Sequence, residues 1–153
     1  MASRHVRYHM GHQDVGHFAD KHPQGTQPDP TFQEKIRQHL IGDQLTCVAA
    51  HRIAQELSVP PARIGIAMDL MEVRIAKCQM GLFGYHPQKR IVTPSKNVPS
   101  RLQEDIQNAL ADQRISCERC WELARKHGLR KIDVASACEA LHVKISRCQL
   151  GAF

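Results

Sequence analysis

Residues 116–141 read SCERCWELARKHGLRKIDVASACEAL, and this stretch decides the fold of the 153-residue chain. Ser116 is a residue type that caps the N-termini of helices, and a helix is expected from Glu118 onwards. Gly128 suits the left-handed position at which many helices end. A further helix is expected from about Lys131 to the end of the stretch. The stretch therefore predicts two short helices joined by a tight turn.

Apolar side chains on either side of this stretch predict two more elements. Residues 101–113 carry apolar side chains at helical spacing, which predicts a helix before the pair. Those side chains are Leu102, Ile106, Ala109 and Leu110. Val143 and Ile145 alternate with polar residues, which is the period of a short strand. One unit of the fold is thus three short helices followed by a strand.

The chain contains this unit twice. Residues 31–83 align with residues 101–153 without a gap, and 13 of the 53 pairs are identical. Each copy ends in the same signature, CQMGLF at 78–83 and CQLGAF at 148–153. A register kept over this length indicates an internal repeat, so both copies are expected to fold alike.

The first copy carries the same signals with small differences. Its second helix is expected at residues 47–57. Pro60 and Pro61 are expected to open its third helix, because the missing N–H of proline costs nothing in a first turn. Val73 and Ile75 begin its strand. The predicted fold class is therefore mainly α, in two tandem copies.

Composition divides the rest of the chain. Residues 1–30 hold five of the ten histidines together with proline and glycine, which predicts a disordered or loosely attached tail. Residues 84–100 contain three prolines, three basic residues and no acid, which predicts an extended linker. The expected domains are accordingly the two copies, at 31–83 and 101–153.

The bulk numbers favour a cytoplasmic protein. No run approaches 18 apolar residues and the N-terminus lacks an apolar signal core, so we expect neither a membrane span nor secretion. The six cysteines are then expected to be reduced and buried. The net charge of +6 permits binding to a polyanion without requiring it.

At two positions of its helix pair, the chain resembles the helix-turn-helix superfamily. That superfamily has a small residue at the fifth position of its motif and glycine or another small residue at the ninth. Counting from Ala50, the first copy has Ala54 and Ser58 there, and the second copy has Ala124 and Gly128. Two helices that cross steeply leave no room for a larger side chain at the contact, and the turn favours a residue that tolerates positive φ.

Apolar positions of the motif extend the resemblance over both copies, 106 residues in all. They are Ile53, Leu57, Val59, Ile64 and Ala67 in the first copy, and Leu123, Leu129, Val134 and Ala137 in the second. His127 departs from the apolar rule, and we expect it at the edge of the core. The resemblance implies a winged or strand-extended variant, with an additional short strand at residues 45–47 and 115–117.

In this superfamily the second helix of the motif usually enters the DNA major groove. The resemblance therefore implies DNA contacts for the start of that helix in the second copy, while the basic residues of the linker are expected along the phosphate backbone. These candidates are Arg130, Lys131, Asp133 and Ser136, with Arg63 in the first copy and Lys89, Arg90 and Lys96 in the linker.

The corresponding helix of the first copy is less suited to contacting DNA bases. Gly65 and Ile66 are expected at outward positions where readers usually carry polar side chains. We therefore expect this helix to contact a protein surface, such as a second copy of the chain. The predicted interaction residues are Ile66, Pro60 and Pro61.

The cysteines allow two interpretations. Cys47 with Cys78, and Cys117 with Cys148, are expected to face each other across a small sheet, either as buried side chains or as reversible disulfides. The single Cys117-x-x-Cys120 motif lacks the second pair that zinc sites usually need, so no metal site is predicted.

No catalytic motif or phosphate-binding glycine loop is present in the sequence, so we expect no enzyme and no cofactor. The sequence favours a DNA-binding protein, either a transcriptional regulator or a nucleoid-type binder. The alternatives are a helix-turn-helix module used for protein contacts, as an accessory or dimerising protein, and a thiol-based redox or metal sensor.

Overall fold

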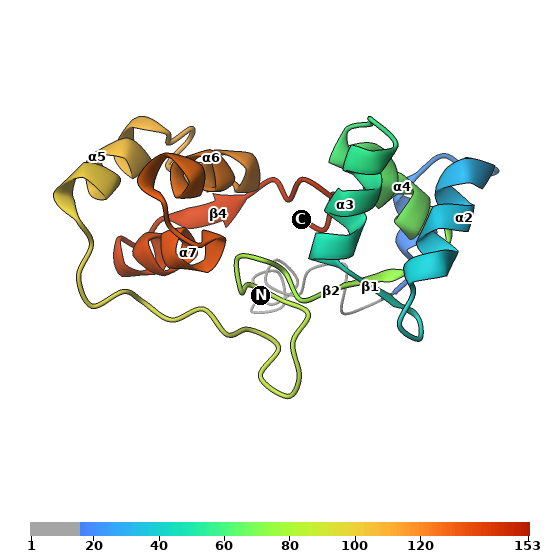
Figure 1. Cartoon of the computed structure of the whole chain (residues 1–153), viewed down its shortest axis with the longest axis horizontal. Helices are drawn as coiled ribbons and strands as arrows, with labels where there is room; N and C mark the ends of the chain where they lie inside the picture. Colours follow the sequence, from blue (N-terminus) through green and yellow to red (C-terminus); the bar gives the residue numbers. More distant parts are fainter. Residues whose placement is uncertain (1–15) are drawn as a thin grey trace, which may run out of the picture. The chain divides into compact units, whose positions relative to one another are not determined.

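The computed structural model describes residues 16–153 and divides into two compact units (Figure 1). Of the described residues, unit 1 comprises residues 16–77 together with Gln149–Phe153, and unit 2 comprises Cys78–Cys148. The two sequence copies therefore exchange their ends, because most of the signature that closes each copy packs with the helices of the other.

Both units contain the same order of elements. Unit 1 contains the 3-10 helix η2 (Phe18–Lys21), α2 (Pro30–His39), β1 (Gln44–Thr46), α3 (Cys47–Glu56), α4 (Pro61–Leu70) and β2 (Arg74–Ala76). Unit 2 contains α5 (Ser100–Asn108), β3 (Arg114–Ser116), α6 (Cys117–His127), α7 (Lys131–Ala140) and β4 (Lys144–Ser146). Apart from η2, each element of the first copy has its counterpart in the second.

The strands form one small parallel sheet in each unit. β1 pairs with β2, with Leu45 opposite Ile75, and β3 pairs with β4, with Ile115 opposite Ile145. Parallel strands need a long crossover connection, and the intervening helix pair provides it. The chain is thus mainly helical with two small parallel sheets, which confirms the predicted fold class at this level.

Local signals fix the second helix of each copy. The hydroxyl oxygens of Thr46 and Ser116 accept hydrogen bonds from backbone N–H groups in the first turns of α3 and α6, as expected of capping residues. Gly128 ends α6 with φ 63°, in the left-handed region. Ala54 and Ala124 are buried, and α3 packs on α4 as α6 packs on α7.

One helix is shorter than the sequence indicated. The helix expected over residues 101–113 ends at Asn108. Asp112 and Gln113 have positive φ, and Ala111 exchanges backbone hydrogen bonds with Arg114. The apolar spacing continues into this tight turn because the turn also faces the core, so periodicity alone overestimated the helix.

The first residues that the structure describes are docked on unit 1, which corrects the expectation of a loosely attached tail for this part of residues 1–30. Phe18 is only 1% exposed. The N–H groups of Phe18 and Ala19 each donate to the Glu72 carboxylate at 2.9 Å. Residues 1–15, with three of the tail's five histidines, lie outside the described residues.

Glu72 should make this docking sensitive to acid. Burial raises the pKa of Glu72, but the N–H groups of Ala19 and Phe18 outweigh it and hold the pKa below its ordinary value of 4.5. A carboxyl whose pKa falls on folding stabilises the folded state above its unfolded pKa, and this stabilisation is lost as pH falls through the lower folded pKa. We expect Glu72→Gln to reduce the loss of stability between about pH 7 and about pH 3, measured by urea unfolding. An unchanged pH dependence in the variant would contradict this role.

Among residues 16–153, none of the helices combines the length and the apolar character needed to cross a membrane.

Candidate functional site

The third helices, α4 and α7, are the surfaces to which the sequence assigned partner contacts. In each unit, a segment without regular secondary structure lies along this helix. We call residues 78–95 the α7 cover and residues 149–153 the α4 cover. Both belong to the unit that they cover.

The α7 cover contacts the helix through apolar side chains. A Cβ atom on Gly81 would lie 2.8 Å from the Cδ1 atom of Ile132, so backbone and side chain are in close contact. Met80 and Val92 are buried in the same core cluster as Ala135, which is fully buried. The outward side of α7 is therefore partly inside the core of unit 2.

Polar contacts hold the same cover along the helix. The N–H group of Ser95 donates to the carbonyl oxygen of Ser136 at 2.9 Å. The Arg90 guanidinium pairs with the Glu139 carboxylate. The predicted linker, residues 84–100, is thus fixed to α7 at two points.

The cover is also folded on itself. The N–H groups of Ile91 and Val92 both donate to the carbonyl oxygen of Gly81, at 2.9 and 3.1 Å. The hydroxyl of Tyr85 donates to the carbonyl oxygen of Cys78 at 2.6 Å. These bonds hold the cover in a looped conformation.

The α4 cover approaches its helix even more closely. Gly65 is buried, and a Cβ atom at this position would overlap the carbonyl oxygen of Leu150 and lie 2.7 Å from its carbonyl carbon. The expectation that Gly65 faces outward, free for a partner, is therefore wrong, because the chain's own backbone lies against it. Its neighbour Ile66 is 41% exposed, as the sequence indicated.

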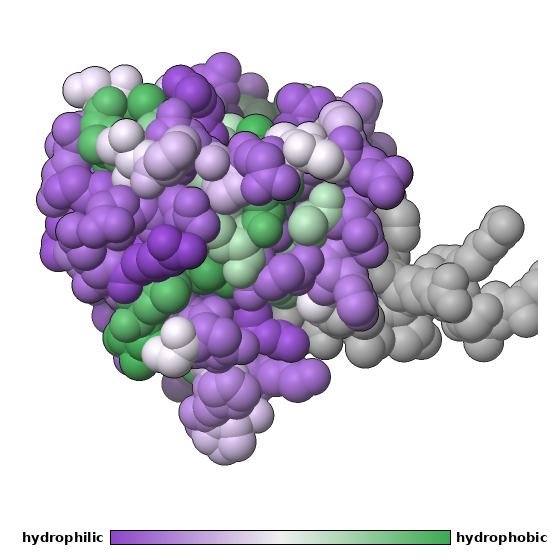
Figure 2. Space-filling model, turned by 90° about the vertical axis from the view of Figure 1, so that its right-hand side faces the viewer, coloured by the Kyte–Doolittle hydropathy of each residue, from purple (hydrophilic) through white to green (hydrophobic). Residues whose placement is uncertain are grey.

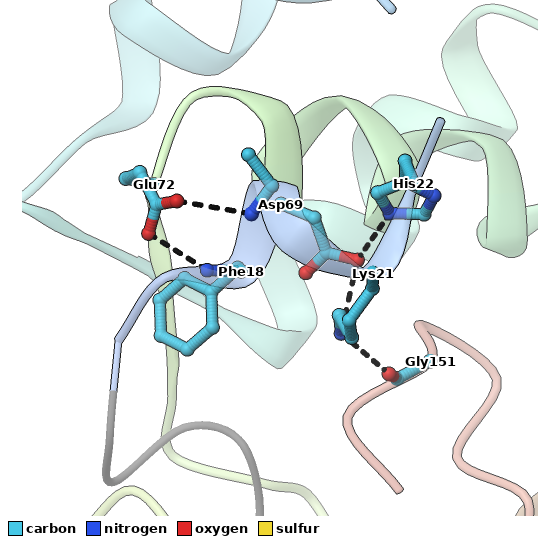
Figure 3. Close-up of polar contacts among 7 residues, drawn as sticks. Phe18, Lys21, His22, Asp69, Glu72 and Gly151 are labelled. Carbon is cyan, nitrogen blue, oxygen red and sulfur yellow. Dashed lines mark hydrogen bonds and ion pairs between the residues drawn. The ribbon is translucent and has the colours of Figure 1, made fainter. Parts of the chain in front are cut away.

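A buried carboxylate organises the polar side of the α4 cover (Figure 3). Among residues 16–153, Asp69 is the buried charged side chain, at 4% exposure. Its Oδ2 atom lies 3.0 Å from Nζ of Lys21 and 2.9 Å from Nε2 of His22. Lys21 also donates to the carbonyl oxygen of Gly151 at 3.0 Å. Figure 3 shows Lys21 reaching both the helix carboxylate and the cover.

The two units use equivalent positions for these contacts. In the repeat alignment Gly65 corresponds to Ala135, and Asp69 corresponds to Glu139. Each acidic residue pairs with a basic residue from outside the repeat that carries it, Lys21 in unit 1 and Arg90 in unit 2. Covering of the third helix is therefore a property of both units.

The residues predicted to read DNA are engaged within the chain. The Arg130 guanidinium binds the Asp133 carboxylate through two nitrogens, at 3.1 and 2.8 Å. These hydrogen bonds raise the pKa of Arg130 and lower that of Asp133. The ammonium of Lys131 lies 4.3 Å from the centre of the Trp121 ring. The sequence analysis predicted neither interaction. The acidic residue three positions after Arg130 was a sequence signal for the ion pair between Arg130 and Asp133.

The other predicted contacts are distributed over both units. In unit 1, the Arg63 guanidinium lies 5.0 Å from the centre of the Phe32 ring. Lys89, Arg90 and Lys96 are exposed on the α7 cover and the segment that follows it. Pro60 is exposed and Pro61 is half-buried at the start of α4.

Apolar residues are also present on the surface of unit 1. Figure 2 shows them as separate green patches within a hydrophilic surface on the side that it faces. The exposed large apolar residues of unit 1 are Ile41, Val48, Ile66 and Phe153.

His127 lies at the edge of the core, as expected. Its Nε2 atom is 2.7 Å from Oδ2 of Asp105, and Nζ of Lys126 is 2.9 Å from the same oxygen. Hydrogen bonds from Lys126 and His127 lower the pKa of Asp105. This cluster joins α5 to the end of α6, and so explains why a histidine replaces the apolar residue of the first copy.

Within residues 16–153, which include all six cysteines, no disulfide is formed. Cys47, Cys78 and Cys117 are buried and Cys148 is half-buried, and burial raises the pKa of Cys78. Sequence reasoning missed a contact between Cys120 and Cys138, whose hydrogen bond, together with burial, raises the pKa of Cys120. Within residues 16–153, no three histidine, cysteine or acidic side chains converge to hold a metal ion.

Comparison of the chain with protein-family models, curated proteins and solved structures finds no match. The assignment of a function therefore depends on the surfaces of the third helices.

Proposed function

We propose that the chain is a non-enzymatic interaction protein made of two tandem helix-turn-helix modules, and that the third helix of each module binds protein segments instead of DNA bases. The packing of α3 on α4 and of α6 on α7 supports the helix-turn-helix assignment. So does the burial of Ala54 and Ala124, which occupy the position where the superfamily has a small residue.

The covering of α4 and α7 carries the functional part of the proposal. A helix that reads base edges must present its outward side chains to the major groove. Here the α7 cover contacts the outward side of α7 at Ile132 and Glu139. On α4, Leu150 of the α4 cover contacts Gly65, and Lys21 contacts Asp69. A duplex could reach these positions only after the covers had left.

Hydrogen exchange on the full chain tests this covering. The N–H group of Ser95 donates to Ser136 of α7, whereas those of Ile91 and Val92 donate to Gly81 within the cover. We expect all three amides to exchange at least ~10-fold more slowly than unprotected amides. Exchange of the Ser95 amide at the unprotected rate would mean that the cover does not stay on α7, and the proposal would fail.

DNA binding, which the sequence favoured, is the second candidate. The observation that favours it is the net charge of +6, together with exposed basic side chains such as Lys89 and Lys96. On the covered structure, such binding would involve phosphates and not bases.

Fluorescence anisotropy with a labelled random DNA duplex separates the two candidates. For the segment-binding protein we expect at most non-specific affinity, weaker than about 10⁻⁶ M at physiological salt. Phosphate binding predicts that Lys89→Ala with Lys96→Ala reduces the slope of log K against log salt by about 0.9 for each lost contact. Tight binding that Arg130→Ala with Lys131→Ala abolishes would instead show that the start of α7 binds DNA, and it would overturn the first proposal.

A further inference from the structure

The α4 cover leaves only one kind of residue possible at position 65. Glycine inside a helix costs about 1 kcal/mol relative to alanine. The equivalent position in α7 is Ala135, so the helix pair itself does not demand glycine. In α4 a Cβ would overlap the backbone of Leu150. The glycine therefore serves the contact between helix and cover.

The cover binds through alternate residues. Leu150 is 2% exposed and Ala152 is 1% exposed, whereas Gly151 between them is exposed. Gly151 has φ +81°, a conformation that other residues rarely adopt. Burial therefore selects the apolar side chains of Leu150 and Ala152, and the positive φ selects glycine at position 151.

Lys21 adds a contact that does not depend on the side chains of the cover. Its ammonium is held by the buried carboxylate of Asp69 and donates to the carbonyl oxygen of Gly151. A fixed cation aimed at the carbonyl oxygen of Gly151 orients the backbone of the bound segment, while the buried side chains select among peptides.

We infer that the α4 surface formed by Gly65, Asp69 and Lys21 is a peptide-binding site, whose ligand class is a turn-forming segment with the sequence large apolar, glycine, small apolar. Residues 150–152 are its resident ligand. This inference deepens the proposed function and rests on it, because it names what the third helix of unit 1 binds.

The experiment frees the site in the full chain and offers the ligand separately. Leu150→Asp places a charge at a buried position, which should detach the chain's own cover. A labelled peptide of sequence Gln-Leu-Gly-Ala-Phe should then bind the variant at least ~10-fold more tightly than it binds the unchanged chain, in which the tethered cover competes at an effective concentration of about 1 mM. Adding Gly65→Ala should abolish this binding, and a Gln-Asp-Gly-Ala-Phe peptide is the negative control. No binding to Leu150→Asp, or equal binding after Gly65→Ala, would overturn the inference.

A second measurement does not require Leu150→Asp to fold. In the full chain with Gly65→Ala alone, chymotrypsin should cleave after Leu150 at least ~10-fold faster, because Leu150 is buried only while the cover lies on α4. The helix content should not fall, because alanine favours the helix. An unchanged rate of cleavage would also overturn the inference. Both measurements report on unit 1, whereas exchange in the α7 cover and DNA anisotropy test the proposed function. Failure of the peptide-binding inference is therefore distinguishable from failure of the proposed function.

Discussion

Phe18→Ala should lower the free energy of unfolding of unit 1 by about 3 kcal/mol, as expected when a large buried aromatic side chain is truncated. Phe18 is 1% exposed and is held in place by the hydrogen bonds from its own N–H and that of Ala19 to Glu72. Removing the ring leaves a cavity. The segment cannot move to fill this cavity, because the two hydrogen bonds hold it in place. Urea unfolding of the full chain, followed by circular dichroism, measures the loss.

The matched control is Ile41→Ala, because Ile41 is a large apolar residue of the same unit that is 71% exposed. It should change the free energy of unfolding by less than about 0.5 kcal/mol. The single tryptophan, Trp121, lies in unit 2, so its fluorescence reports on the other unit. If Phe18→Ala were as mild as Ile41→Ala, the segment that contains η2 would not belong to the core of unit 1.

This docking was outside the reach of sequence reasoning for a physical reason. The 3-10 helix η2 has four residues, too few to show a periodicity. Its anchor is a carboxylate 54 residues away, and the surrounding histidines, prolines and glycines have the composition of a tail. A single aromatic residue within such a segment was the only available signal.

The helix pairs were predictable because their signals are local. Ser116 at the cap, Gly128 at the C-terminus and apolar residues at helical spacing all lie within the elements that they specify. The internal repeat then extended the assignment to the first copy. Such patterns specify one helix at a time, and they do not depend on where the neighbouring elements pack.

The covers were not predictable because the exchange of ends has no local signature. The sequence assigns 78–83 and 148–153 to the copies that they close, and nothing in their spacing indicates the other helix. Two hints existed in α4, namely a glycine inside the helix at Gly65 and an acid, Asp69, on a helix with few charges. Both indicate a close neighbour without identifying it, so the candidate site required the structure.

The second large effect concerns the crossings on which the helix-turn-helix assignment depends. Ala54→Leu and Ala124→Leu should each lower the free energy of unfolding by about 2–3 kcal/mol, because three added carbons must fit between two packed helices. Both alanines are buried, and each carbonyl oxygen accepts a hydrogen bond from the turn that follows, from the N–H groups of Val59 and Leu129. The turn therefore fixes the distance between the helices and limits the room for relaxation.

Gln55→Leu and Arg125→Leu introduce the same side chain one residue further along, at exposed positions on the same helices. They should change the free energy of unfolding by less than about 0.5 kcal/mol. Trp121 fluorescence reports the effect of Ala124→Leu, and circular dichroism reports both variants. If both copies form the same module, the two alanine variants must behave alike. A large loss in one unit and none in the other would mean that the repeated sequence has two different helix crossings, and the tandem helix-turn-helix assignment would then have to be given up.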